Sequence, residues 1–242
     1  PFLIGWGGTV TKPIQLGLGL ELHPFRLGLS EDQQRIVHGL RRFTTPEARI
    51  LIEDHPQPSP TWNWTALLGL TCQRYFLGGL DSEACVEHAF CQLRAGRLNG
   101  RRLADWTYLE RQQFCQRYNV GWILCRSEAS AAWWLEQPGS QELARFHDDG
   151  PVILVELDRP RSFILVGTAT LERHDRQEIV LVDAIPNAAG ELVLSMHHQP
   201  GFRITPSVAK LESDPDPYDP IPMLKMRLPG PISRIVLTWE NP

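Results

Sequence analysis

The sequence predicts an α/β unit followed by an all-β unit within one chain of 242 residues. Up to about Gly150, apolar residues recur at helical spacing and alternate with short apolar runs, which is typical of helices interleaved with strands. After Gly150, short β-rich runs are separated by Pro, Gly, Asn and Asp, which is typical of a β-sandwich. We therefore expect a linker or membrane-proximal segment over 1–29, an α/β domain over 30–146 and a β-sandwich domain over 151–242.

The first unit is expected to open with a capped helix and a buried strand. Ser30 and Gln33 fit a capping box, and the helix that follows should end before Pro46. The run ARILIE then predicts a buried strand that ends at Glu53. The proline-rich segment after this strand cannot be helical, because proline breaks the helix hydrogen-bond ladder.

The alternation of helices and strands continues to the end of the first unit. Further strands are expected at 75–77 and 120–125, and further helices at 66–70, 82–93, 107–118 and 128–135. Thr107 and Glu110 fit a capping box for the helix over 107–118. Together these elements predict a small, mostly parallel sheet in three layers, a half-Rossmann-like unit. No G-x-G-x-x-G segment joins a strand to a helix, so no dinucleotide cofactor is expected.

The second unit is expected to contain about seven or eight short strands. The apolar runs that predict them are PVILVELD, SFILVGTATLE, QEIVLVD, GELVLSM, MLKMRL and SRIVLTW. Proline- and glycine-containing turns separate these runs, as at Pro186-Asn187 and Pro229-Gly230-Pro231. This spacing favours a β-sandwich that resembles a jelly roll.

Composition excludes some classes of partner and setting. Hydrophobic residues make up 42% of the chain, which is enough for a real core, and the net charge is −4. With no basic field, nucleic acid is not expected as a partner. The chain opens without Met and has no continuous apolar stretch long enough to span a membrane, so we expect a segment of a longer protein.

The end of the first strand is the best candidate for a ligand site. Glu53, Asp54 and His55 follow that strand, and open α/β sheets bind ligands outside the carboxyl ends of their strands. The alternative is a solvated strand end in which Asp54 caps the proline-rich loop. In the adjoining loop, Trp62 and Trp64 are candidates to stack on a sugar or line a membrane interface, with core packing as the alternative.

Three further residues are weaker ligand candidates. Asp81 follows a Gly-Gly turn and should begin the next helix, where it either binds a ligand or caps the helix. Glu87 and His88 are neighbours on that helix and point about 100° apart, so a metal would need partners from elsewhere, such as His55. No cluster has the spacing of a known metal motif, and the five cysteines contain no C-x-x-C pair. We therefore expect no metal or other cofactor, and no residue is assigned a catalytic role.

Several motifs together resemble a known family. They are ARILIEDH, TWNWTALLGL, RYFLGGLD, the pair Glu87-His88, LADWT, CQRYNVGWILC and SDPDPYDPIPMLKMRLPGPISRIVLTW. From Ser30 to Trp239 the chain resembles the C-terminal soluble region of large bacterial polytopic membrane proteins. These are similar to the GT-C class of glycosyltransferases, and some carry a label relating them to 6-pyruvoyl-tetrahydropterin synthase.

The resemblance implies an accessory domain on the extracytoplasmic face of a bacterial membrane. Such a domain would contact the membrane-embedded portion of the same polypeptide and recognise envelope glycan or a lipid-linked sugar. In the GT-C class the catalytic carboxylates lie in loops between spanning helices, so this chain is not expected to be catalytic by itself. The alternatives are a non-catalytic structural or protein-interaction module of the cell envelope, and a stand-alone hydrolase that uses Glu53 or Asp54.

Overall fold

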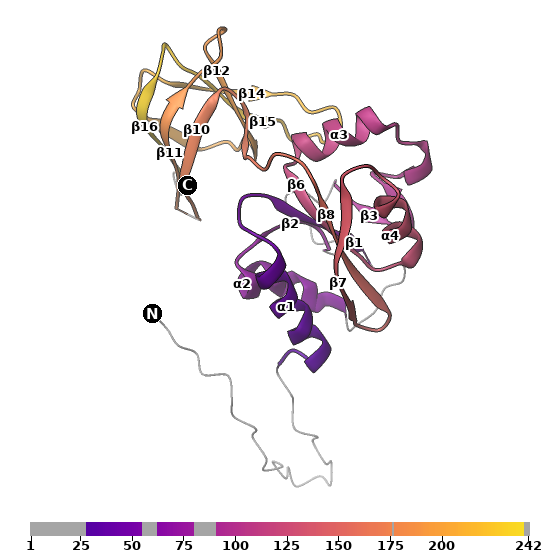
Figure 1. The fold of residues 1–242 in the computed structure, drawn as a ribbon. Helices are drawn as coiled ribbons and strands as arrows, with labels where there is room; N and C mark the ends of the chain where they lie inside the picture. Colours follow the sequence, from indigo (N-terminus) through magenta and orange to yellow (C-terminus); the bar gives the residue numbers. More distant parts are fainter. Residues whose placement is uncertain (1–27, 55–61, 80–90, 176, 240–242) are drawn as a thin grey trace, which may run out of the picture.

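The computed structural model, which describes residues 28–54, 62–79, 91–175 and 177–239, confirms an α/β unit followed by a β-sandwich (Figure 1). The helices of the α/β unit are α1 (Glu31–Phe43), η1 (Trp62–Leu67), α2 (Leu68–Cys72), η2 (Leu103–Asp105), α3 (Tyr108–Arg117) and α4 (Glu128–Leu135). Its strands are β1 (Arg49–Asp54), β2 (Tyr75–Gly78), β3 (Leu93–Arg94), β4 (Arg97–Leu98), β5 (Arg101–Arg102), β6 (Val120–Cys125), β7 (Ser140–His147) and β8 (Pro151–Leu157). The strands of the sandwich follow from β9 onward.

The eight strands of the α/β unit form one mixed sheet with β1 near its centre. The strand order is β5-β4-β3-β1-β6-β8-β7, and β2 also pairs with β1. Strands β2, β3 and β6 run parallel to β1, whereas β8 is antiparallel to β6. Leu51 packs with residues of α3 and α4, and Ile50 and Ile52 pack with residues of α1 and α2. Helices therefore cover both faces of the sheet, which gives the expected three layers.

Local sequence signals fix the ends of the helices. The capping box at Ser30 is present, with the Gln33 amide nitrogen 3.2 Å from Ser30 Oγ. Thr107 begins α3 in the same way, and its amide lies 2.8 Å from Glu110 Oε2. Both caps are therefore confirmed.

The predictions for the linker and for the segment between β2 and β4 are not confirmed. The expected helix at 82–93 falls largely on residues 80–90, which lie outside the described residues, and its last residue, Leu93, begins β3 instead. The expected linker is likewise described only at Gly28 and Leu29. The short strands β3, β4 and β5 were not predicted.

The second unit is a sandwich of two four-stranded antiparallel sheets. One sheet has the order β10-β11-β16-β13 and the other has the order β14-β15-β12-β9. Their bounds are β9 (Ile164–Val166), β10 (Thr168–His174), β11 (Glu178–Ile185), β12 (Glu191–His197), β13 (Phe202–Thr205), β14 (Lys210–Asp214), β15 (Met223–Arg227) and β16 (Ile232–Trp239). Buried residues from both sheets form one core, in which Leu181, Leu194 and Ile235 are inaccessible to solvent.

The expected boundary between the two units, between 146 and 151, is wrong. Residues 151–157 form β8, which lies between β6 and β7 in the α/β sheet and not in the sandwich. Asp149-Gly150 is the turn of the β7–β8 hairpin, and both residues have positive φ. The error has a physical cause: a central strand is buried on both faces and has the same continuous apolar pattern as a sandwich-core strand.

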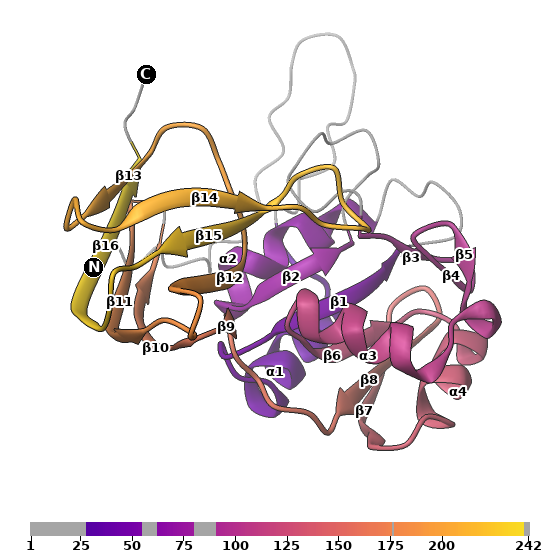
Figure 2. The ribbon, with the colours of Figure 1, turned by 90° about the horizontal axis from the view of Figure 1, so that it is seen from above.

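The two units share a polar and apolar interface at the amino end of β1. Arg49 Nη1 donates to Tyr118 O at 2.9 Å and to Ser195 Oγ at 2.8 Å, so it joins β1 to β12. Its guanidinium also lies over the Phe163 ring, 4.9 Å from the centroid. Val193 of β12 packs within the α/β core. The sandwich consequently lies beside β2 and away from α4 (Figure 2).

The position of β8 predicts a specific disulfide. Cys125 in β6 pairs with Ile153 in β8, and antiparallel partners have Cα atoms about 4.5–5.5 Å apart, within the range that a disulfide can bridge. We expect Ile153→Cys, refolded with oxidised glutathione, to give a peptide cross-linked from residue 125 to residue 153 in non-reducing mass spectrometry. Val152→Cys is the matched control, because its side chain faces the opposite side of the sheet. Failure to cross-link at 153, or equal cross-linking at 152, would contradict the strand order.

Candidate functional site

The Glu53 carboxylate caps helix α4. Its Oε2 accepts hydrogen bonds from the backbone amides of Arg126 at 2.8 Å and Ser127 at 3.0 Å. Its Oε1 accepts from Ser127 Oγ at 3.0 Å and from Ser130 Oγ at 2.6 Å. Glu53 is 2% exposed, so its negative charge is held by the donors and the positive dipole end of α4. Both of its oxygens are therefore already used by the fold.

The Asp54 carboxyl group has a different environment. Its Oδ1 accepts a hydrogen bond from the Gly79 amide at 2.7 Å, and the residue is 6% exposed. Among the described residues, none donates a hydrogen bond to its Oδ2. Burial raises the pKa of Asp54 from 3.8 to about 6, although the Gly79 hydrogen bond and the positive charge of Arg94 act to lower it. Asp54 is thus a buried carboxyl group whose Oδ2 accepts no hydrogen bond from the described residues.

The turn after β2 brings the Gly79 amide to Asp54. Gly78 and Gly79 have φ values of +68° and +73°, a region that L residues with side chains rarely adopt. A Cβ on Gly78 would lie 2.7 Å from Ile52 O, so only glycine allows this close approach. Thr65 Oγ1 donates to Gly79 O at 2.5 Å and ties η1 to the same turn.

A second chain of contacts reaches the same edge from β6 and the β7–β8 turn. Arg126 Nη1 lies 3.4 Å from Asp148 Oδ2, and Trp64 Nε1 donates to the same oxygen at 3.0 Å. The Arg126 side chain is only 5% exposed. Its Nη2 is buried and has no hydrogen-bond partner among the described residues. A buried donor without a partner is costly, and it marks a place where a ligand oxygen would be stabilised.

The structure gathers part of the expected site. Glu53 and Asp54 are the last residues of β1 at the carboxyl edge of the sheet, and Trp64 of η1 contacts Asp148 in the β7–β8 turn. Trp64 is buried within the core between the sheet and α1, so its ring is packed and not exposed for stacking on a sugar. Trp62 begins η1, but its side chain lies outside the described part of the chain.

The remaining expected ligand residues cannot be placed. His55, Asp81, Glu87 and His88 all lie outside the described residues. Arg126, Asp148 and Gly79 are the residues that sequence reasoning missed. Arg126 carried a usable signal, because it follows a predicted parallel strand and precedes a helix, which is where open α/β sheets place ligand-binding residues.

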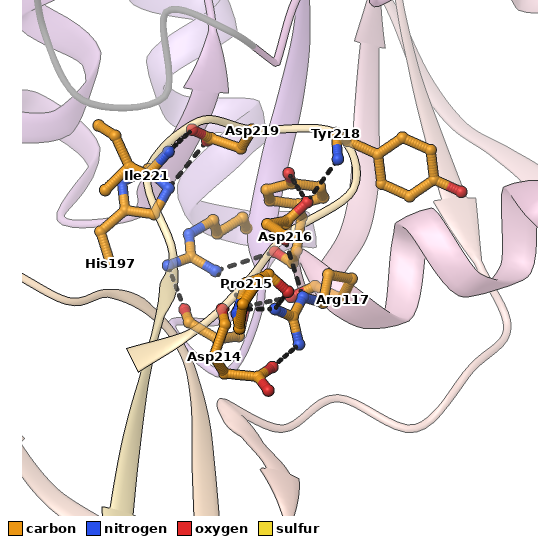
Figure 3. Close-up of polar contacts among 11 residues, drawn as sticks. Arg117, His197, Asp214, Pro215, Asp216, Tyr218, Asp219 and Ile221 are labelled. Carbon is orange, nitrogen blue, oxygen red and sulfur yellow. Dashed lines mark hydrogen bonds and ion pairs between the residues drawn. The ribbon is translucent and has the colours of Figure 1, made fainter. Parts of the chain in front are cut away.

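A second polar cluster joins α3 to the connection between β14 and β15. Arg117, at the end of α3, contacts Asp214 Oδ2 at 2.5 Å and Asp216 Oδ2 at 2.8 Å, and Figure 3 shows its guanidinium between them. Asp216 Oδ1 accepts from Tyr118 Oη at 2.9 Å, and the Asp216 side chain is fully buried. This cluster fastens the sandwich to the α/β unit. Its charges are paired with one another, which favours a structural role.

The neighbouring His197 is also paired within the fold. Its Nε2 lies 2.9 Å from Asp219 Oδ2, and both side chains are buried (Figure 3). Ser195 donates its hydroxyl to Arg117 O at 2.8 Å, so it serves the interface and is not arranged as a nucleophile. These contacts give no complete catalytic arrangement within the described residues.

The described residues also contain no obvious metal site or reactive thiol. No group of three or more His, Cys, Asp or Glu among them could hold a metal ion. Cys72, Cys91, Cys115 and Cys125 are buried and unpaired. Burial raises the pKa of Cys91 and of Cys115 to about 12, so these thiols stay protonated at neutral pH.

Comparison with known proteins adds no functional information. No protein-family model, curated protein or solved structure matches this chain. Within the described residues, no helix combines the length and the apolar character needed to cross a bilayer.

The role of Glu53 as a helix cap can be tested by stability. Glu53→Gln replaces acceptor lone pairs with a donor facing the α4 amides, so we expect the free energy of unfolding to fall by about 2–3 kcal/mol in urea titrations. Glu128→Gln is the matched control, because Glu128 lies at the same end of α4 but is 62% exposed. It should lose less than about 1 kcal/mol. If the two variants were equally stable, the capping role would be wrong.

The raised pKa of Asp54 predicts a pH-dependent effect on stability. Because the folded-state pKa of about 6 lies above the usual 3.8, ionised Asp54 destabilises the fold, and this cost grows as pH rises through that range. Asn keeps the Oδ1 acceptor but carries no charge. We therefore expect Asp54→Asn to match the wild type near pH 4 and to be more stable by about 2 kcal/mol near pH 8, after allowance for solvent screening.

The measurement is urea unfolding of both proteins over this pH range. The difference between variant and wild type isolates Asp54 from other titrating groups. A difference that does not change with pH would show that the Asp54 pKa is not raised.

Proposed function

We propose that this chain is the extracytoplasmic accessory domain of a GT-C-like membrane glycosyltransferase and recognises envelope glycan or a lipid-linked sugar. Its site is the carboxyl edge of the α/β sheet, centred on Asp54 and Arg126. In this proposal the domain contacts the membrane-embedded portion of the same polypeptide and does not catalyse the transfer itself. The sequence motifs support the family in this proposal, and the geometry of the carboxyl edge supports the site.

One observation supports this site above the others in the described residues. Among the described residues, none donates to Asp54 Oδ2 and none accepts from the buried Arg126 Nη2, and both atoms belong to residues at the same end of the sheet. Sugar hydroxyls both donate and accept hydrogen bonds, so a glycan can satisfy both atoms. Phosphate or diphosphate of a lipid-linked donor would also accept from Arg126.

Two other functions receive less support. A stand-alone glycoside hydrolase needs two available carboxyl groups, and Glu53 uses both of its oxygens to cap α4. A purely structural or interaction module is favoured by the buried ring of Trp64, which packs in the core. That alternative leaves the unpaired nitrogen of Arg126 without an explanation.

The first test of the proposal concerns the gene. The reading frame that contains this chain should also encode several apolar segments of about 20 residues, each long enough to span the membrane. The second test uses the full-length polypeptide in membrane vesicles with a radiolabelled polyprenyl-phosphate hexose as donor. We expect Asp54→Asn and Arg126→Gln each to lower sugar transfer by about tenfold or more, because each removes a hydrogen bond that involves a charged group.

Glu128→Gln is the control in this assay, since it removes a carboxylate charge, as Asp54→Asn does, but from an exposed side chain. Circular dichroism of the isolated chain checks that each variant is folded. If folded Asp54→Asn and Arg126→Gln proteins transferred sugar at the rate of Glu128→Gln, the site would be wrong and the structural module would be the better explanation.

A further inference from the structure

A pocket lies between the amino end of β2 and the sandwich, away from the carboxyl edge. It has a volume of about 150 Å³ and is open to solvent on one side. Tyr75 comes from the α/β unit, and His174, Phe202 and Trp239 come from strands of the sandwich. Ile179 and Met196, which are buried, supply apolar surface. Ligand sites occur preferentially at such junctions between domains.

Two aromatic pairs line this pocket. The rings of Tyr75 and His174 are stacked, with centroids 4.9 Å apart and an interplanar angle of 22°. Those of Phe202 and Trp239 lie 4.5 Å apart. Trp239 Nε1 donates to Gln199 Oε1 at 2.9 Å, and Tyr75 Oη donates to His174 O at 3.3 Å. These hydrogen bonds hold Tyr75 and Trp239 in fixed orientations.

The polar character of the pocket favours an uncharged ligand. Nδ1 of His174 is buried and has no hydrogen-bond partner among the described residues. Burial lowers the pKa of His174 to about 4, and the charge of Arg49 acts in the same direction, so the imidazole is neutral at neutral pH. Arg49 directs its terminal nitrogens to Tyr118 and Ser195. A neutral imidazole nitrogen pairs with a hydroxyl group, which is the kind of group that an uncharged ligand offers.

The volume of the pocket is enough for one ring of a ligand. A cavity of roughly 150 Å³ is large enough for a single benzene-sized molecule. We propose that this pocket binds one uncharged pyranose ring, such as the terminal residue of a glycan. An apolar face of the sugar packs on the aromatic side chains, and a hydroxyl group pairs with His174 Nδ1.

This inference does not depend on the carboxyl edge. The pocket begins at Tyr75, the first residue of β2, whereas the turn that contacts Asp54 follows Gly78, the last residue of that strand. The two sites therefore lie at opposite ends of β2.

The test uses the isolated chain and the methyl glycosides of glucose, mannose and galactose. Saturation-transfer NMR at about 10 mM sugar should detect binding of at least one of them, since millimolar dissociation constants correspond to weak but measurable affinity. His174→Phe keeps a ring beside Tyr75 but removes Nδ1, and Trp239→Leu removes an aromatic wall. We expect each substitution to weaken binding roughly tenfold.

A matched control separates this pocket from other sites. His147→Phe changes an exposed histidine of β7 that belongs to neither site, and it should bind as the wild type does. Circular dichroism confirms the fold of each variant. Binding of none of the three glycosides, or binding that folded His174→Phe and Trp239→Leu proteins retain in full, would overturn the proposal. Tighter binding of glucuronate than of all three methyl glycosides would overturn the uncharged class.

Discussion

The buried guanidinium of Arg49 is the interaction on which the arrangement of the two units depends. Arg49 is the first residue of β1, which pairs with three other strands. Its guanidinium donates hydrogen bonds to Tyr118 O and to Ser195 of the sandwich. A buried charge is tolerated only when its hydrogen bonds are satisfied, so a shift of the sandwich that broke the contacts of Arg49 with Ser195 would be costly. Arg117 adds a second anchor through Asp214 and Asp216. The interface is consequently held by specific polar contacts as well as by apolar packing.

The same strand sets the positions of the two carboxyl groups at its other end. Successive residues of a strand point to opposite faces of the sheet. Glu53 therefore points to the side covered by α3 and α4, where it meets the amino end of α4. Asp54 points to the opposite side and meets Gly79, whose carbonyl is held by η1. Adjacent carboxyl groups thus acquire different roles because the two faces of β1 are covered by different elements.

Local signals predicted the parts of the fold that depend on neighbouring residues. The capping boxes at Ser30 and Thr107 act over three residues, and both form as expected. The hairpin turn at Asp149-Gly150 was instead interpreted as a domain seam, because the apolar run after it fits a central strand of either unit. The β4–β5 hairpin had a signal in Asn99-Gly100, a dipeptide whose residues both have positive φ. Contacts between residues about one hundred positions apart, such as Arg117 with Asp216, have no local signal.

The sequence predicted where the candidate site lies but not which side chains contact one another there. The end of β1 identified Glu53 and Asp54, whereas Arg126 and Asp148 reach the edge only once β6 and β8 are placed in the sheet. The structure then separates the two carboxyl groups by their contacts. Glu53 has the saturated hydrogen bonds of a structural carboxylate. Asp54 is buried at a cost to stability, and its Oδ2 has no donor among the described residues. This combination of a destabilising carboxyl group and an acceptor without a donor is the reason why the proposed site is centred on Asp54 and not on Glu53.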